Sequence, residues 1–233
     1  MNRQSNAYTL LYIIIMVAVV GSALAFTSMS LKDRQNDNIA ADKMRQILAS
    51  VHIVPQKSDV ISEYNKYITE SFIVNSLGQR LPGNAFDVNV AAQLSESAQS
   101  RQLPVYVATM AGGEKKYILP VYGAGLWGPI WGYVAFDSNG STIYGAYFAH
   151  QSETPGLGAE IEKPSFSKRF IGKNLFKGDR LLPVAVVKAG QKPSGDQDYV
   201  DGISGGTITS KGVGTMLDEC LKPYASFLKT LRK

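Results

Sequence analysis

The sequence is poor in the residues that most often carry redox chemistry or bind metals. It has one cysteine, Cys220, and two histidines, His52 and His150. One cysteine excludes a disulfide within the chain and an iron–sulfur cluster held by four of its own thiolates. The patterns His-Glu-x-x-His and Cys-x-x-Cys, and a Gly-x-Gly-x-x-Gly after a strand, are also missing. We therefore predict no metal site and no redox chemistry carried by the side chains themselves.

Charged residues are also scarce. Asp, Glu, Lys and Arg make up 18% of the chain, and the net charge of +5 is spread out, with a weak basic cluster at Lys229, Arg232 and Lys233. Nucleic-acid binding needs a concentrated basic surface and is not expected. A chain of 233 residues with 45% hydrophobic content has room for one membrane segment and one domain with a sizeable core.

The long apolar run Ala7–Phe26 carries no charged residue. At about 1.5 Å per helical residue, a run of this length spans about 30 Å, the thickness of the hydrocarbon layer of a bilayer. We predict a transmembrane anchor over residues 1–27. The alternative is a cleaved signal peptide, because Ala23-Leu24-Ala25 resembles a cleavage site. The run is longer than a usual signal core and only Arg3 precedes it, which favours the anchor.

Two further helices are predicted after the anchor. Ser28–Ser50 reads as an amphipathic helix within a membrane-proximal connector, residues 28–57. Its apolar face is formed by Ala40, Met44, Ile47 and Leu48. Ser58–Ile68 reads as a shorter helix capped by Ser58. The side chains expected to point inward from it are Ile61, Tyr64 and Ile68.

The remainder, residues 58–233, predicts a single α+β domain. Alternating apolar residues indicate a strand at Phe86–Val90 and two hairpins, one of them turned by Asn139-Gly140. The hairpin strands are Leu103–Met110 with Lys115–Val121, and Trp131–Asp137 with Thr142–His150. A last helix buries Val213, Leu217, Cys220 and Leu221. Consecutive antiparallel strands with helices before and after predict an antiparallel sheet flanked by helices.

A loop rich in glycine and hydroxyl groups runs directly into this last helix. It reads Asp201-Gly202-Ile203-Ser204-Gly205-Gly206-Thr207-Ile208-Thr209-Ser210. Unpaired N–H groups at a helix start suit a phosphate, which a hydroxyl of the loop could also esterify. The plainer interpretation is a helix start capped by Ser and Thr. The loop also fits Gly-x-Ser-x-Gly, a hydrolase elbow, but both histidines precede Ser204, whereas that fold needs its histidine afterwards.

Two upstream segments have the same loop-like composition. Tyr122–Pro129 contains Leu126 and Trp127 between glycines, and Trp127 offers a flat apolar face. His150–Gly158 follows a strand, and its glycines let backbone N–H groups approach a ligand. Its candidate contact residues are Glu153, Thr154, Gly156, Leu157 and Gly158. On pattern alone, a buried tryptophan and an ordinary strand-ending loop are the plainer interpretations.

Together these blocks resemble the FMN-binding domain family. Asp201–Thr207 is similar to its flavinylation motif, usually Asp, two variable residues, Ser or Thr, Gly, Ala and Thr, and Glu153–Gly158 is a hallmark of the same family. The resemblance implies FMN bound covalently to Thr207 through a phosphoester, installed by a separate flavin transferase. It implies that Asp201, Ser204, Gly205, Gly206 and Thr209 surround the cofactor. Gly206 departs from the usual alanine but keeps the site small.

The order of all these blocks is similar to that in the C subunits of bacterial sodium-translocating NADH:quinone reductases. Leu31–Gln35, Ile47-Leu48 and Glu160–Pro164 favour this group over the related G subunits of Rnf complexes. The resemblance implies an electron relay between a membrane iron centre and the flavin of a neighbouring subunit. Its partners would be the other subunits, and it would have no catalytic residue of its own. A stand-alone tethered FMN carrier and a serine hydrolase using Ser204 remain as alternatives.

Location and orientation rest on the same resemblance. It implies a single-pass protein of the inner membrane whose domain lies on the periplasmic side. Four basic residues follow the apolar run, namely Lys32, Arg34, Lys43 and Arg45. Counting them would instead put the domain in the cytoplasm, but the rule is weak for long domains. The apolar run has no ionisable residue, so we expect a sodium path to belong to partner subunits.

Overall fold

The structure is a computed structural model that describes residues 6–97 and 99–232, so Arg3 and Lys233 lie outside it. The chain divides into two compact units, residues 1–43 and residues 44–233. The second unit contains the sheet and all of the candidate site residues.

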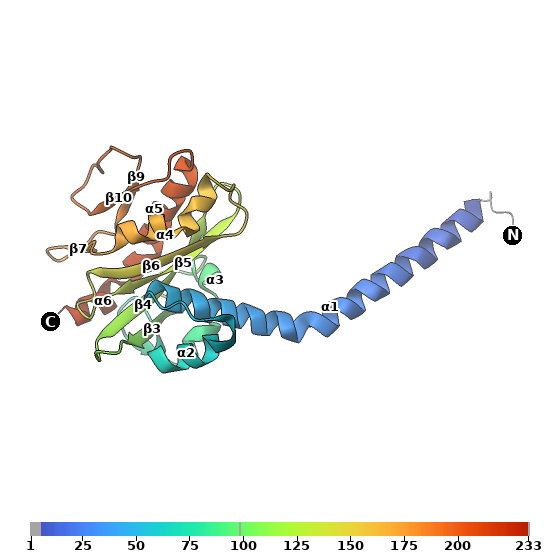
Figure 1. Ribbon diagram of the computed structural model, residues 1–233, viewed down its shortest axis with the longest axis horizontal. Helices are drawn as coiled ribbons and strands as arrows, with labels where there is room; N and C mark the ends of the chain where they lie inside the picture. Colours follow the sequence, from blue (N-terminus) through green and yellow to red (C-terminus); the bar gives the residue numbers. More distant parts are fainter. Residues whose placement is uncertain (1–5, 98, 233) are drawn as a thin grey trace. The chain divides into compact units, whose positions relative to one another are not determined.

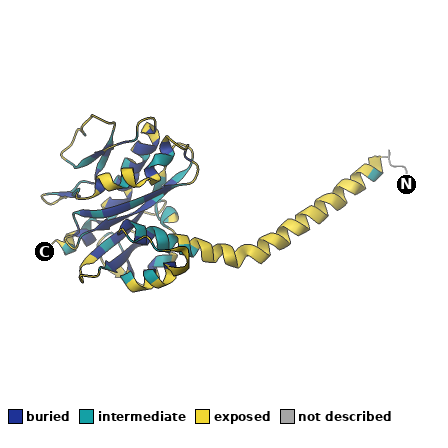
Figure 2. Cartoon of the chain, viewed as in Figure 1, coloured by how far each residue is buried: buried dark blue, intermediate teal, exposed yellow. Residues whose placement is uncertain are grey.

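Helix α1, Asn6–Ser50, is continuous over 45 residues. The predicted anchor and the predicted amphipathic helix are therefore parts of one helix, which no proline interrupts. An 18-residue window has a mean hydropathy of 2.5, and none of it is buried (Figure 2). By length and composition this helix is able to cross a membrane, a test that an N-terminal signal sequence also passes.

The C-terminal end of α1 is anchored in the second unit. Ile47 and Leu48 are fully buried, as their predicted place on the apolar face requires. The helix ends in a Schellman motif, in which the N–H of Ile53 donates to the carbonyl of Leu48 and that of His52 to Ala49. His52 occupies the left-handed position with φ of 64°, where glycine is usual. Its ring compensates by hydrogen-bonding the carbonyl oxygen of Tyr144 at 3.0 Å.

A six-stranded antiparallel sheet forms the centre of the part of the second unit that the structure describes, in the order β2-β1-β3-β4-β5-β6 (Figure 1). The strands are β1 Ile68–Val74, β2 Arg80–Leu81, β3 Leu103–Thr109, β4 Lys115–Ala124, β5 Pro129–Phe136 and β6 Ile143–His150. Both predicted hairpins are confirmed, as β3–β4 and β5–β6. The turn of the second has Gly140 at φ of 62°, and Asn139 accepts from the N–H groups of Ser141 and Thr142.

Alternate residues of the strands enter two hydrophobic clusters, one on each face of the sheet. On one face Val105 and Val107 pack with Val213 and Leu217 of helix α5, Thr207–Leu221. On the other face Tyr106 and Ala108 pack with the end of α1 and with Tyr64 of helix α2, Val60–Tyr67. Strand β3 is buried along most of its length because helices cover both faces (Figure 1). The predicted fold class, an antiparallel sheet flanked by helices, is confirmed.

Two local predictions were wrong. Phe86–Val90 is not a strand but spans a 3-10 turn, Ala85–Asp87, and the start of helix α3, Val90–Gln93. The side chains of Asn84 and Asn89 accept from the N–H groups of Phe86 and Ala92, and these caps select helical turns over extension.

The second error concerns the helix predicted at Ser58–Ile68. A 3-10 turn at Lys57–Asp59 precedes α2, so Ser58 does not cap it. This places Val60 and Tyr64 in the core and leaves Ile61 at 60% exposure.

Short elements complete the domain. They are η3 Gly158–Glu162, α4 Pro164–Ser167, η4 Lys168–Phe170, β7 Phe176–Lys177, β8 Arg180–Leu181, β9 Ala185–Val187, β10 Tyr199–Asp201, η5 Lys222–Tyr224 and α6 Ala225–Leu231. Strands β9 and β10 pair in parallel, which sets the β9 end beside the loop that leads into α5. Cys220 of α5 is buried, as predicted, and burial raises the pKa of its thiol to about 11.

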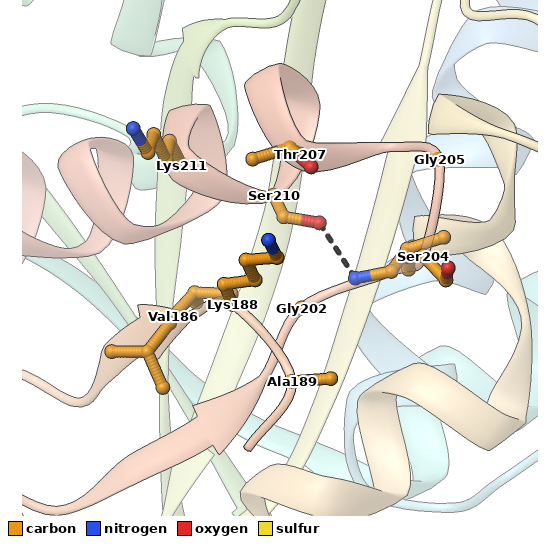
Figure 3. Close-up of a pocket in the computed structure, with 11 residues that line it drawn as sticks. Val186, Lys188, Ala189, Gly202, Ser204, Gly205, Thr207, Ser210 and Lys211 are labelled. Atoms are coloured by element: carbon orange, nitrogen blue, oxygen red, sulfur yellow. Dashed lines mark hydrogen bonds between the residues drawn. The ribbon is translucent and has the colours of Figure 1, made fainter. Parts of the chain in front are cut away.

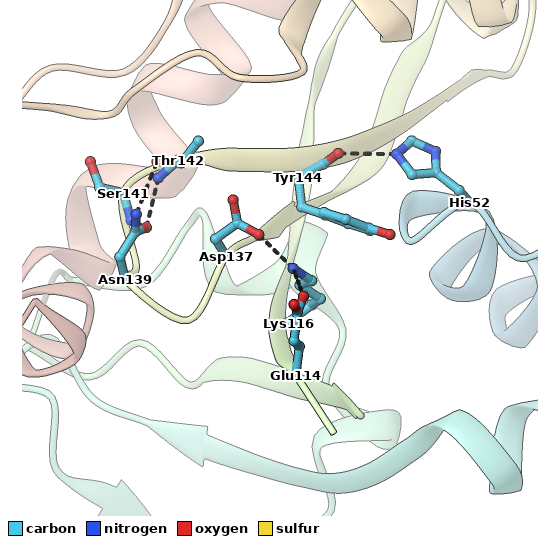
Figure 4. A network of polar contacts seen from close by, with 8 residues as sticks. All are labelled: His52, Glu114, Lys116, Asp137, Asn139, Ser141, Thr142 and Tyr144. Atoms are coloured by element: carbon cyan, nitrogen blue, oxygen red, sulfur yellow. Dashed lines mark hydrogen bonds and ion pairs between the residues drawn. The ribbon is translucent and has the colours of Figure 1, made fainter. Parts of the chain in front are cut away.

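A polar network ties three strands together near the end of α1 (Figure 4). Lys116 on β4 is buried and pairs with Asp137 at 2.7 Å and Glu114 at 2.9 Å. Its ammonium group also lies 4.2 Å from the ring centroid of Tyr144 on β6, the residue whose carbonyl oxygen bonds the His52 ring. Burial of Lys116 is thus matched by two carboxylates and an aromatic face.

Candidate functional site

Three segments far apart in the sequence line one open pocket of about 220 Å³, which we call the apolar pocket. The β4–β5 turn contributes Leu126 and Trp127. The segment after β6 contributes Glu153, Thr154, Leu157 and Gly158. The start of α5 contributes Gly205, Gly206, Thr207 and Thr209. The structure therefore brings together the three blocks that the sequence singled out.

Glu153 joins these segments through both of its carboxylate oxygens. The N–H of Trp127 donates to Oε1 at 2.8 Å, and the hydroxyl of Thr209 donates to Oε2 at 2.5 Å. The side chain is buried, with 4% of the residue exposed. Burial acts to raise the pKa of Glu153, but the hydrogen bonds from Thr209, Trp127 and Leu126 prevail and hold that pKa below its ordinary value. The two hydrogen bonds link the Glu153 carboxylate to the β4–β5 turn and to α5, and a role of Glu153 toward a cofactor stays a prediction.

Glycines make room for this carboxylate. A Cβ at Gly125 would meet Oε1 of Glu153, and a Cβ at Gly158 would meet Oε2 and the hydroxyl of Thr209. Real Cβ atoms essentially never come that close, so both positions need glycine while Glu153 keeps its place. Gly125 also closes the β4–β5 turn by donating to the carbonyl of Gly128 at 2.8 Å.

The loop before α5 is held from both ends. The N–H of Gly202 donates to the carbonyl of Val187, and the N–H of Ile203 donates to the hydroxyl of Ser210 at 2.8 Å. Gly205 then turns the chain with φ of 78°. Gly206 is the N-cap residue of α5, and among the described residues no side chain caps this helix. The capping role that Ser or Thr was considered for is therefore not seen, and the first N–H groups of α5 point outward.

The hydroxyl groups of this loop differ in accessibility. Thr207 is exposed at the first position of α5, whereas Thr209 is 1% exposed and donates to Glu153. Ser204 is exposed but does not line the apolar pocket. Among the hydroxyl groups of this loop, that of Thr207 is therefore the one that is both exposed and part of the lining of the apolar pocket.

Exposed apolar side chains surround Thr207. Trp127 is 66% exposed, Ile208 58%, Leu126 46% and Leu157 44%. The plainer expectation of a buried tryptophan is therefore wrong for Trp127. Sequence reasoning missed Ile208, although an apolar residue directly after the predicted attachment site was a usable signal. Such a group of exposed apolar side chains is typical of a ligand or partner site.

A second pocket, which we call the basic pocket, is also lined by Thr207 (Figure 3). Its volume is about 110 Å³, and Ser204, Gly205, Thr207, Ser210, Lys188 and Lys211 are part of its lining. Thr207 and Gly205 line both pockets. The two lysines were not predicted as site residues.

Two predicted residues are not brought into either pocket. Asp201 accepts from the N–H of Gly190 at 3.3 Å, and its carbonyl accepts from Arg169 at 2.8 Å. Gly156 has φ of 76° and donates to Glu160, so its place is in the turn. Both residues shape the loops; their role toward a cofactor stays a prediction.

The geometry gives no support to a serine hydrolase. Nδ1 of His150 accepts from the N–H of Glu153, and the His52 ring binds the Tyr144 carbonyl at the end of α1. Neither histidine lines the basic pocket where Ser204 lies. A histidine base for Ser204 is therefore not assembled within the described residues.

Comparison with known proteins first defines the class. Residues 125–222 match the sequence model of the FMN-binding domain. This stretch runs from the β4–β5 turn to the end of α5 and so includes both pockets.

Whole-chain comparisons define the group within that class. The chain is 32% identical to the C subunit of the Na(+)-translocating NADH-quinone reductase of Vibrio anguillarum, over 93% of this chain and 91% of the relative. It is 30% identical to that of Yersinia pestis, over 100% and 95%. The crystal structure of the C subunit from Parabacteroides distasonis shares 49% identity with a TM-score of 0.80, covering 85% of this chain and 96% of the other. Shewanella oneidensis NqrC, at 23% identity and a TM-score of 0.69, shares the fold, over 83% of this chain and 98% of the other.

The chain belongs to the family of the C subunits of Na(+)-translocating NADH-quinone reductases. The predicted resemblance is confirmed, and members of this family are subunits of an oxidoreductase complex.

Proposed function

We propose that this chain is the electron-relay subunit of a sodium-translocating NADH:quinone reductase and carries FMN as a phosphoester on Thr207. The observation that carries the proposal is the place of the Thr207 hydroxyl. It is exposed at the uncapped start of α5, in a loop that matches the flavinylation motif, at the junction of the apolar pocket and the basic pocket.

The residues of the site fit an FMN group. The glycines at 205 and 206 leave the start of α5 open, and backbone N–H groups there suit a phosphate. The exposed faces of Trp127 and Leu157 suit an aromatic ring. When bound, FMN supplies one-electron and two-electron chemistry that the side chains lack. The protein then holds and orients the flavin, and no residue acts as a general acid or base.

Attachment uses Thr207 as the nucleophile. Its Oγ would form the new bond to the phosphorus of an activated flavin phosphoanhydride and would lose its proton to a base supplied with the flavin transferase. The phosphoanhydride bond would break, and the departing phosphate would take the electron pair. Thr209 is a poor substitute because its hydroxyl is buried and bonded to Glu153.

Flavin attachment to Thr207 is tested by expressing the full chain with a flavin transferase. We expect the denatured wild-type band to fluoresce as flavin and its intact mass to increase by one FMN less one water. Thr207→Ala should abolish both, while Thr207→Ser, which keeps a hydroxyl, should retain some loading. Fluorescence that persists in Thr207→Ala would show that another residue carries the flavin.

The proposed electron path links an iron centre in the membrane subunits to the flavin of a neighbouring subunit. Family membership supports this assignment over an Rnf-type G subunit, because the full-length relatives are named as C subunits of the reductase. A stand-alone carrier would extract from the membrane without partners, whereas a relay subunit should copurify with integral membrane subunits in mild detergent.

We propose that α1 anchors the chain in the inner membrane with the domain on the periplasmic side. The apolar window of α1 supports an anchor, while the basic residues that follow it would favour the opposite orientation. Two fusions to the C-terminus decide between a periplasmic and a cytoplasmic domain. One carries a phosphatase that is active in the periplasm alone, and the other a fluorescent protein that fluoresces in the cytoplasm alone. Phosphatase activity with a dark fluorescent fusion is expected, and the reverse result would invert the topology.

A further inference from the structure

The basic pocket differs from the apolar pocket in the charged residues of its lining. Its lining includes the ammonium side chains Lys188 and Lys211 and the hydroxyl groups of Ser204 and Ser210, and it contains no carboxylate. The apolar pocket is lined instead by Leu126, Trp127, Leu157 and Ile208, with the Glu153 carboxylate beneath them. Thr207 lines both pockets, of which the basic pocket suits a negatively charged group and the apolar pocket suits an aromatic ring.

The two lysines reach this pocket from different elements. Lys188 directly follows β9, and its side chain extends toward Ser210 and Thr207 (Figure 3). Lys211 lies four residues after Thr207 on α5, and residues at this spacing are neighbours on a helix surface. In Figure 3 its ammonium group points away from Thr207, so a change of side-chain rotamer is needed to bring it to a group on that hydroxyl. Within the described part of the chain, neither side chain has an ion-pair or hydrogen-bond partner. Their charges are therefore available to a ligand.

The pocket is also held in shape. The N–H of Gly202 binds the carbonyl of Val187, which fixes the distance between the β9 end and the loop. The hydroxyl of Ser210, 3% exposed, accepts from Ile203 and ties the loop to α5. A Cβ at Gly202 would come within 2.9 Å of Ser210, so glycine permits this close approach.

We propose that the basic pocket holds the phosphoryl group esterified to Thr207, with Lys188 and Lys211 as its positioning residues. The phosphodiester keeps one negative charge, shared by two unesterified oxygens, to which the ammonium groups can donate charge-assisted hydrogen bonds. Because the phosphoryl group is held on this side, the flavin leaves Thr207 toward the apolar pocket and its ring lies over Trp127 and Leu157. This inference rests on the proposed attachment at Thr207.

The test compares flavin loading of the full chain in detergent by a flavin transferase. The variants are Lys188→Gln, Lys211→Gln and the double variant. Lys192→Gln is the matched control, because Lys192 is exposed on the loop that follows β9 but does not line the basic pocket. We measure the initial rate of covalent incorporation, and then the fluorescence anisotropy of the flavin on the folded, fully loaded protein.

We expect the double variant to load about tenfold more slowly and to show lower anisotropy, because the phosphoryl group is no longer held. Lys192→Gln should behave as wild type, and arginine at both positions should restore the anisotropy. Added salt should lower the wild-type loading rate more than that of the double variant. All these lysines are exposed, so folding is expected to be unchanged, which a melting curve checks.

Three results separate the possibilities. If the wild type takes up no flavin at Thr207, the proposed function itself fails. If the wild type loads and the double variant matches it in rate and anisotropy, only the present inference is overturned. If the rate falls but the anisotropy of the loaded double variant equals that of the wild type, the lysines serve transferase docking, and the phosphoryl-holding role is likewise overturned.

Discussion

The carboxylate of Glu153 accepts from a turn on one side and from α5 on the other, so a single side chain sets the spacing of the apolar pocket. Glu153→Gln keeps the shape of this side chain but removes its charge. We expect the free energy of unfolding to fall by about 1–3 kcal/mol at pH 7, because charged hydrogen bonds become neutral ones. Urea unfolding of wild type and variant measures this difference.

The same residue predicts a pH dependence. The pKa of Glu153 is lower in the folded protein than the ordinary value of about 4.3. The stabilisation that ionised Glu153 gives to the folded state is therefore fully present above about pH 4.3. It is lost as pH falls from there through the folded-state pKa. The stability difference between wild type and Glu153→Gln should therefore be constant from pH 7 to pH 5 and shrink below about pH 4. A difference that grows on acidification would contradict this assignment.

The glycines of the site differ in whether the structure has room for a Cβ at their positions. A Cβ at Gly158 would meet Glu153 and Thr209, whereas one at Gly206 would lie 3.1 Å from the carbonyl oxygen of Leu157. We expect Gly158→Ala to lose most flavin loading and about 1–3 kcal/mol of stability, as overpacking costs. Gly206→Ala, which restores the residue usual in the family motif, should load nearly as wild type. In-gel flavin fluorescence compares the two.

At the scale of elements, the end of α1 rests on β6 only because residue 145 has no side chain. A Cβ at Gly145 would meet the carbonyl oxygen of Ser50 and the ring of His52. Gly145→Ala should therefore push the end of α1 outward and cost about 1–3 kcal/mol in urea unfolding. Gly112→Ala is the matched control, because nothing lies within 4 Å of its added Cβ. Equal urea-unfolding midpoints for Gly145→Ala and Gly112→Ala would mean that the end of α1 moves to accommodate the added methyl group without loss of stability.

The helices and strands also show which parts of the fold the sequence could predict. The turn residues Asn139-Gly140 marked the second hairpin correctly, because the positive φ of Gly140 is a local property. Phe86–Val90 was mistaken for a strand because Asn84 and Asn89 were not recognised as caps.

The candidate site likewise contains residues that the sequence could predict and residues that it could not. Its three loops were found because each carries a compact local motif. Lys188 was not predicted as a site residue. It lies in the same pocket as Thr207 because β9 pairs with β10, and no local sequence pattern predicts that pairing. The paired bonds of Glu153 likewise depend on tertiary structure.

At the scale of the whole molecule, the boundary of the folded unit is testable. The compact second unit starts at residue 44, while the sequence predicted a domain from residue 58. A chain starting at Ala40 should melt like the full chain. One starting at Ser58 lacks Ile47, Leu48 and Val51, all fully buried, each worth about 1.5–3 kcal/mol. Calorimetry of the two truncated chains decides, and equal melting temperatures would support the later boundary.

Thr207 is exposed at the surface of the finished domain, at the first turn of a helix whose other end is packed in the core. The proposed flavin attachment at Thr207 would therefore require no unfolding, and a transferase could modify a domain that has already reached its native state. Synthesis, insertion and maturation become separable events in time. Under the proposed attachment, supply of the flavin, and not folding of the polypeptide, would set how many copies are competent.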